Sequence, residues 1–356
     1  MGLIRFFLAY SVVIAHFLFF PTFRLIGGEV AVEGFFIISG FYIAMILNNQ
    51  YSSTKDFLIN RFLRLYPAYI VIAGFNFIVN LIEPGELKNI FDFPPLLSGY
   101  IIFTNATMMF QDLAMFIGLQ DGHLRFVKNF LDSSPVIFRY LLIPQAWTLG
   151  IEISFYIFAP ILFFRRYKYI YFFFIVSLVI RIYLLNHGKF DDPWSYRFFP
   201  SELALFMLGA VAYNLYIKFD FKENIVLYTE IGKFLLALIL GFILFFPNIT
   251  IPYEFKKGLF YLLLAIAIPF IFNLTKNNKI DRFIGELSYP IYLIWGLRID
   301  VTKIITDYFH ITNENIKGLI FYGFILIAAI VIHLLIEKPI EKIRVHFRTR
   351  QLRSIS

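Results

Sequence analysis

Residues 30–48 read VAVEGFFIISGFYIAMILN, an apolar run with one charged residue, Glu33. A helix rises 1.5 Å per residue, so a run of this length can cross the roughly 30 Å hydrocarbon core of a bilayer. An ionisable group within such a segment costs roughly 2.5 to 3.5 kcal/mol on insertion scales, and its presence favours a functional role or a charged partner. The stretch therefore predicts a membrane-spanning helix in which Glu33 has either a functional role or a charged partner.

The composition of the whole chain agrees with a membrane environment. Of its 356 residues, 59% are hydrophobic and 16% are charged, 47 are phenylalanine, and the mean hydropathy is +0.73. These values are typical of a polytopic membrane protein. The chain contains no cysteine, which excludes disulfides, thiolate metal sites and acyl transfer through a cysteine thioester.

Nine further runs are apolar and long enough to span the membrane. With 30–48 they predict an all-α bundle of ten transmembrane helices, the other nine being 3–20, 65–82, 147–164, 167–185, 198–217, 232–247, 258–274, 286–305 and 317–336. The first run lacks the basic head and cleavage site of a signal peptide, so we expect an uncleaved span. Residues 96–118 are interrupted by Asn105, Gln111 and Asp112, and we expect a re-entrant or interfacial segment there.

Loop charges orient the predicted bundle. Residues 341–356 form a basic tail, which is a cytoplasmic signal under the positive-inside rule, and alternate loops counted back from it are also basic. Ten spans with both termini in the cytoplasm follow, with residues 1–340 as one integral membrane domain. We expect the protein to lie in the inner (cytoplasmic) membrane of a bacterium and to contact its lipids.

Several polar residues interrupt the apolar runs at informative depths. His16 follows Arg5 by eleven residues, which places the two about 16 Å apart in depth along a helix. Arg5, Arg61 and Arg64 fall near the predicted cytoplasmic side, whereas His16, Glu33 and Glu152 fall toward the outer side. A basic inner mouth leading to a histidine and carboxylates suits an anionic donor that enters from the cytoplasm and a proton transfer deeper in the membrane.

Six short motifs, taken in this order, resemble those of the acyltransferase family 3 membrane O-acyltransferases. The resemblance covers nearly the whole chain, but one departure is Trp295, where members often have a histidine. The residues that carry it are Arg5 and His16; Phe35, Phe36, Ser39, Gly40 and Phe41; Arg61, Arg64, Leu65, Tyr66 and Pro67; Trp147, Thr148, Leu149 and Glu152; Ser288, Tyr289, Ile291, Tyr292 and Leu293; and Glu337, Lys338 and Pro339.

The resemblance implies transfer of an acyl group, commonly acetyl, from a cytoplasmic thioester such as acetyl-CoA to a hydroxyl of a surface carbohydrate. His16 is the candidate general base, and Glu152, or Glu33 in second place, is the candidate carboxylate that orients its imidazole. Arginine suits the phosphates of a CoA donor, so Arg5, Arg61 and Arg64, with Tyr66 of the same motif, are the candidate donor-binding residues. Ser39 and Trp147 are candidate supporting residues.

Each of these residues also has a structural interpretation. Arg61 and Arg64 could set topology, Glu152 could pair with an arginine, Ser39 and Gly40 could form a helix-packing notch, and Trp147 could anchor the chain at the interface.

For the whole protein, a transporter or flippase of a glycan or its lipid-linked precursor is the competing class, and a membrane scaffold is a third possibility. The sequence does not specify the acceptor, which leaves lipopolysaccharide, capsule, exopolysaccharide, peptidoglycan and lipid-linked glycans open. We expect neither a permanently bound cofactor, a metal nor a nucleic-acid partner.

Overall fold

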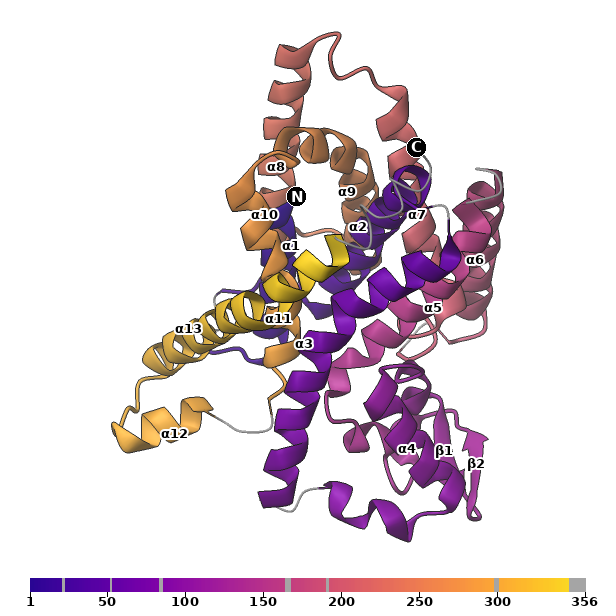
Figure 1. Cartoon of the computed structure of the whole chain (residues 1–356), viewed down its shortest axis with the longest axis vertical. Helices are drawn as coiled ribbons and strands as arrows, with labels where there is room; N and C mark the ends of the chain where they lie inside the picture. The colour runs from indigo at the N-terminus through magenta and orange to yellow at the C-terminus, as the bar shows by residue number, and fades with distance from the viewer. Residues whose placement is uncertain are drawn as a thin grey trace.

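The computed structural model describes residues 1–20, 23–51, 53–82, 86–163, 168–189, 192–297 and 301–345. Within these ranges the chain is mainly helical (Figure 1). Eight described helices, counted with the short turns that continue some of them, are long and apolar enough to cross a membrane. They are α2 (Gly28–Asn49), α3 (Thr54–Ile82), α5 (Trp147–Phe163), α6 (Lys168–Asn186), α7 (Phe199–Lys218), α8 (Ile225–Phe245), α9 (Tyr253–Thr275) and α13 (Glu314–Ile332).

Two of the ten predicted spans take a different form. The first is α1 (Gly2–His16), a helix of 15 residues that stops at His16 instead of continuing to residue 20. At its end Phe17 leaves the helical conformation, and its carbonyl accepts a hydrogen bond from the Tyr322 hydroxyl. Predictions from hydropathy did not detect this stop because residues 17–20 are as apolar as the helix before them.

The predicted span 286–305 is not one helix in the structure. It divides among α10 (Lys279–Glu286), α11 (Ser288–Ile294) and α12 (Val301–Tyr308), and residues 298–300 lie outside the described residues. Gly296, just after α11, packs so closely on the Gln145 side chain that a Cβ at this position would lie 2.3 Å from its amide. Close packing of an irregular segment against the short 3-10 turn Pro144–Ala146, just before α5, accompanies the loss of the expected continuous helix.

The segment 96–118 does not form one long helix either. It contains α4 (Pro95–Thr107), whose 13 residues span roughly 20 Å and cannot cross the hydrocarbon core alone. Strands β1 (Ile117–Gln120) and β2 (His123–Phe126) follow as an antiparallel hairpin, a small exception to the predicted all-α fold. Asp121 and Gly122 have φ of 50° and 75°, which matches the turn that Asp-Gly favours between paired strands.

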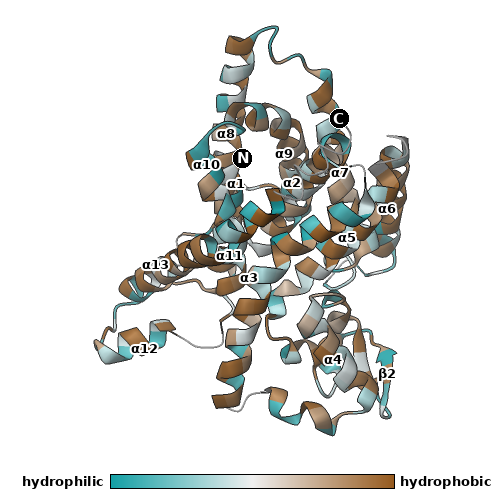
Figure 2. Cartoon of the chain, in the orientation of Figure 1, coloured by the Kyte–Doolittle hydropathy of each residue, from teal (hydrophilic) through white to brown (hydrophobic). Residues whose placement is uncertain are grey.

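Helix α2, which contains the opening stretch, lies at the centre of the bundle. It packs against α1, α5, α7 and α9. Helices α6, α8 and α13 lie at the periphery, where many of their large apolar side chains are exposed. Figure 2 shows these peripheral helices as mostly hydrophobic, as expected for surfaces that face lipid.

The predicted basic tail does not begin as a separate segment. After α13 the chain continues through a π-helical turn, His333–Glu337, and stays helical to residue 345. Arg344 is buried, and its guanidinium donates to the Asn60 side chain of α3 at 2.9 Å. The rest of the tail, 346–356, lies outside the described residues.

Two glycines set the distance between α2 and α7. A Cβ on Gly40 would lie 2.0 Å from the Phe206 carbonyl oxygen, and one on Gly209 would lie 1.9 Å from the carbonyl oxygen of Ile37. Gly40 is therefore a packing notch, as one interpretation of the sequence proposed.

We expect Gly209→Ala to force these helices apart and to lower stability by about 1 to 3 kcal/mol or more, as overpacking does. Thermal unfolding of the detergent-solubilised protein would measure the loss. The matched control is Gly241→Ala on α8, where the new methyl meets nothing within 4 Å and helix propensity alone favours alanine. Equal melting temperatures for the two variants would contradict this account.

Candidate active site

A cavity of about 450 Å³ lies between the helices that carry most of the predicted donor-binding residues. Its wall comes from α1, α2, α3, α5, α9, α10 and α11. Five cationic side chains line it against three carboxylates, so the cavity has an excess of positive charge. We call it the donor cavity; its cations are Arg5, Arg61, Arg64, Lys276 and Arg282, and its acids are Glu152, Asp281 and Glu286.

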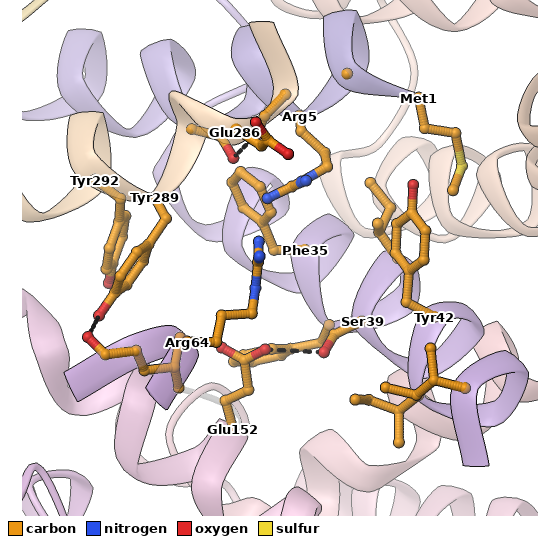
Figure 3. A pocket seen from close by; sticks show the side chains of 18 of the residues that line it. Met1, Arg5, Phe35, Ser39, Tyr42, Arg64, Glu152, Glu286, Tyr289 and Tyr292 are labelled. Carbon is orange, nitrogen blue, oxygen red and sulfur yellow. Dashed lines mark hydrogen bonds between the residues drawn. The ribbon is translucent and has the colours of Figure 1, made fainter. Parts of the chain in front are cut away.

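Arg5 and Arg64 extend toward each other across the donor cavity (Figure 3). Both side chains are half-buried, and neither guanidinium forms a hydrogen bond or a salt bridge with any residue in the described ranges. Arg61 differs, because its Nη2 donates to the Asn60 side chain at 3.2 Å. Two half-buried cations without a bound partner form a site that an anion would satisfy.

The position of Arg5 is fixed by contacts at the start of α1. The Asp281 carboxylate on α10 accepts hydrogen bonds from the Met1 amino group and the Gly2 backbone, each at 2.7 Å, and from the Leu3 backbone at 2.9 Å. Burial alone would raise the pKa of Asp281, but these hydrogen bonds hold it below its usual value. A charged carboxylate thus ties the first turn of α1 to α10.

Glu152 lies in the donor cavity and not beside His16. Its carboxylate accepts a hydrogen bond from the Ser39 hydroxyl at 2.9 Å (Figure 3). It accepts another from the Tyr156 hydroxyl. Ser39 thus connects α2 to α5 at the cavity wall. The sequence placed Glu152 toward the outer side, but the packing of α5 brings it into the same space as the arginines.

His16 lines a second cavity, of about 430 Å³. We call it the aromatic cavity, because six aromatic residues line it besides the histidine: Phe130, Phe138, Trp147, Tyr196, Tyr292 and Trp295. The His16 imidazole stacks on the Trp295 indole, with ring centroids 4.3 Å apart and planes 13° apart. Trp147 is buried in the wall, and the Arg197 guanidinium lies 4.2 Å from the centroid of its ring. Because Trp147 faces this aromatic cavity and is 5% exposed, its position does not match an anchor at the lipid interface.

The structure brings neither predicted carboxylate to His16. Within the described ranges, no hydrogen bond or salt bridge joins His16 to Glu152 or Glu33. Glu33 is fully buried and bonds to Arg181 of α6 at 2.8 Å and to the Tyr261 hydroxyl of α9. The geometry therefore does not support the prediction that Glu152 or Glu33 orients the His16 imidazole, because both carboxylates have other partners.

Glu33 belongs to a buried ionic cluster that joins α2, α6, α7 and α9. Arg181 also bonds to Glu202 at 2.5 Å, and Lys257 lies 3.6 Å from Glu33.

We expect Glu33→Ala to reduce stability by about 3 to 5 kcal/mol, because it leaves buried cations uncompensated. Thermal unfolding would measure the loss, with exposed Glu230→Ala on α8 as the control. A native melting temperature for Glu33→Ala would contradict a structural role.

Tyr66 faces away from the donor cavity. Its hydroxyl donates to the Ala106 carbonyl of α4 at 3.0 Å, and its ring stacks on Phe62. Arg61 and Arg64 share a helix face because they are three residues apart, whereas Tyr66 is two positions beyond Arg64 and points elsewhere. The predicted donor-binding role of Tyr66 therefore lacks support in the geometry, for a reason that helical spacing could have shown.

Among the residues of the aromatic cavity, Arg197, Tyr292 and Trp295 were not candidate catalytic or donor-binding residues. Tyr292 and Trp295 are one helical turn apart along the chain, so their common direction was available from the spacing alone. Arg197 comes from the segment before α7, far from these residues in sequence, and no pattern indicated its position.

Comparisons with known proteins give a consistent picture. The family described as "Acyltransferase domain" matches residues 1–338. A "Putative O-acetyltransferase" of Staphylococcus aureus (strain COL) is 27% identical over 300 residues, which cover 76% of this chain and 46% of that protein. The peptidoglycan O-acetyltransferase OatA of Listeria monocytogenes serovar 1/2a is 27% identical over 368 residues, which cover 94% of this chain and 54% of the relative.

An uncharacterized protein of Aquifex aeolicus (strain VF5) is 30% identical over 213 residues, which cover 57% of this chain and 89% of that protein. The chain spans about half the length of the curated O-acetyltransferases that it matches. No solved structure matches it.

Proposed function

Since this multi-pass membrane protein belongs to the acyltransferase family whose domain covers residues 1–338, we propose that it is a membrane O-acetyltransferase. It transfers an acetyl group from cytoplasmic acetyl-CoA to a hydroxyl of a cell-surface or lipid-linked carbohydrate, in the cytoplasmic membrane of a bacterium. The observation that carries this proposal is the donor cavity, in which Arg5 and Arg64 extend toward each other without an anionic partner among the described residues.

The donor cavity suits a CoA thioester for electrostatic reasons. CoA carries several phosphate charges, and a planar guanidinium can bind a phosphate through two parallel hydrogen bonds. The half-buried position of Arg5 and Arg64 strengthens such a contact, because water screens it less. Arg61 adds charge to the same wall, and Glu152 holds Ser39 and Tyr156 in place.

The aromatic cavity is where we place the acceptor. His16 takes the proton of the acceptor hydroxyl as its oxygen attacks the thioester carbonyl carbon. The carbon–sulfur bond breaks, an ester forms, and the CoA thiolate leaves and is protonated. Because neither predicted carboxylate contacts His16, its stacking on Trp295 is the contact that holds the ring in position.

The test is acetyl transfer by the purified protein in lipid nanodiscs. Radiolabelled acetyl-CoA is supplied with a panel of glycans, starting with peptidoglycan fragments because one relative is named a peptidoglycan O-acetyltransferase. We expect radiolabelled ester on at least one glycan, released by mild alkali. Movement of a glycan across proteoliposomes with no covalent product would overturn the proposal in favour of a transporter.

A further inference from the structure

The donor cavity and the aromatic cavity share two wall residues, Val32 and Tyr292. Helices α1 and α11 each contribute to both cavities from different turns. On α1, Arg5 lines the donor cavity and His16 lines the aromatic cavity. On α11, Tyr289 lines the donor cavity, and Trp295, just after this helix, lines the aromatic cavity. The two cavities therefore lie end to end along the same helices, with Tyr292 at the boundary.

The same order appears on α2 and α5. The start of α2 at Gly28 lines the aromatic cavity and Ser39, further along, lines the donor cavity. On α5, Trp147 lines the aromatic cavity and Glu152 the donor cavity. In all four helices the donor cavity lies toward the end that the loop charges orient to the cytoplasm.

Tyr292 is held firmly at this boundary. It is 8% exposed, its hydroxyl accepts a hydrogen bond from Thr148 Oγ1 at 2.8 Å, and it donates to the Gln145 carbonyl. The Gln145 amide in turn donates to the Leu293 carbonyl at 2.9 Å. These bonds join α11 to the start of α5, so the tyrosine ring cannot swing aside without breaking them.

We propose that Tyr292 is a positioning residue that separates the donor cavity from the aromatic cavity and so couples use of the thioester to transfer. This inference depends on the proposed acetyl-transfer function for its chemistry, but not for its geometry. A thioester open to outside water would be hydrolysed, with water oxygen forming acetate and CoA leaving as the thiol. The closed boundary prevents this side reaction, and it opens when a bound acceptor displaces the Tyr292 ring and breaks its bonds to Thr148 and Gln145, so that the thioester meets the acceptor hydroxyl.

The first test compares hydrolysis of acetyl-CoA with transfer in Tyr292→Ala and Tyr292→Phe. We expect the ratio of hydrolysis to transfer to rise by about tenfold or more in Tyr292→Ala, because the boundary opens to water. Tyr292→Phe keeps the ring but loses both hydroxyl hydrogen bonds, so its ratio should lie between those of the native protein and Tyr292→Ala. An unchanged ratio in Tyr292→Ala would overturn the proposal.

Ile291→Ala is the matched control on the same helix. Ile291 is buried, but it lines neither the donor cavity nor the aromatic cavity. Its truncation removes buried packing on α11 and leaves the boundary closed, so the ratio of hydrolysis to transfer stays native. If Tyr292→Ala does not fold, Val32→Ala opens the other side of the boundary and gives the same rise in the ratio.

The second test needs no acetyl transfer and uses the absence of cysteine in the chain. Ser39→Cys places one thiol in the donor cavity, which a membrane-impermeant, negatively charged thiosulfonate reagent can label in inside-out or right-side-out vesicles. We expect labelling from the cytoplasmic side only, and from both sides when Tyr292→Ala is added. Labelling that is the same with and without Tyr292→Ala would overturn the proposal.

The two tests separate the two hypotheses. If vesicle labelling changes as expected but no glycan is acetylated, the boundary exists and the proposed function is wrong. If glycans are acetylated but Tyr292→Ala changes neither the labelling nor the ratio of hydrolysis to transfer, the proposed function stands and this inference is wrong.

Discussion

His16→Ala is expected to lower the rate of acetyl transfer to a glycan by about 10²- to 10⁴-fold, the contribution typical of a general base. The imidazole lines the aromatic cavity and lies on Trp295, whereas the candidate donor-binding arginines lie in the other cavity. Donor affinity should therefore stay native, and kcat should carry the loss. Steady-state kinetics with radiolabelled acetyl-CoA, combined with calorimetric donor binding, would measure both effects.

His187→Ala is the matched control, because His187 is an exposed histidine at the end of α6 that stacks on Tyr183. Its removal should leave transfer unchanged. His16→Gln adds a second comparison, since it keeps a polar side chain but cannot take up the proton at neutral pH. Full transfer by His16→Ala would remove this histidine from the mechanism.

The second large effect is expected from Arg64→Ala, which should raise the dissociation constant for acetyl-CoA about 10- to 100-fold. Loss of a hydrogen bond to a charged group costs about 1.5 to 3 kcal/mol, which corresponds to this range. Arg64 forms no hydrogen bond or salt bridge within the described ranges, so its removal breaks no ion pair and the loss should appear in donor binding. Isothermal titration calorimetry in detergent would measure it.

Arg125→Ala controls for loss of a positive charge, because Arg125 is exposed on β2 and remote from the donor cavity. Arg64→Lys should recover only part of the affinity, since an ammonium group cannot form the two parallel hydrogen bonds of a guanidinium. Native donor binding in Arg64→Ala, with no change in acceptor use, would leave this arginine as a determinant of topology.

The sequence predicted the membrane-spanning segments well where hydropathy alone is sufficient to identify them. Eight of the predicted runs are long apolar helices in the described chain, because hydropathy over a span is a local sum. The sequence did not predict the division of 286–305, where Gly296 packs against Gln145 in the turn before α5. The hairpin at 117–126 had a usable signal in Asp121 and Gly122, which the apolar pattern around them obscured.

The sequence predicted several residues of the candidate site, but it did not predict how they are arranged. Arg5, Arg61 and Arg64 share one cavity, as their predicted depth suggested. Glu152 joins them instead of His16, and Glu33 pairs with Arg181. Depth along a helix follows from residue number, but the partner of a side chain depends on how that helix is rotated against its neighbours.

The sequence by itself determined that this chain is a membrane protein, where most of its spans lie, and which polar residues interrupt them. Only the tertiary structure decided that these residues divide between two cavities that meet at Tyr292. The physical reason is that burial in lipid is additive along the chain and can be read locally. A cavity, in contrast, is what remains when several helices pack, and it is set by close contacts such as those at Gly40 and Gly209.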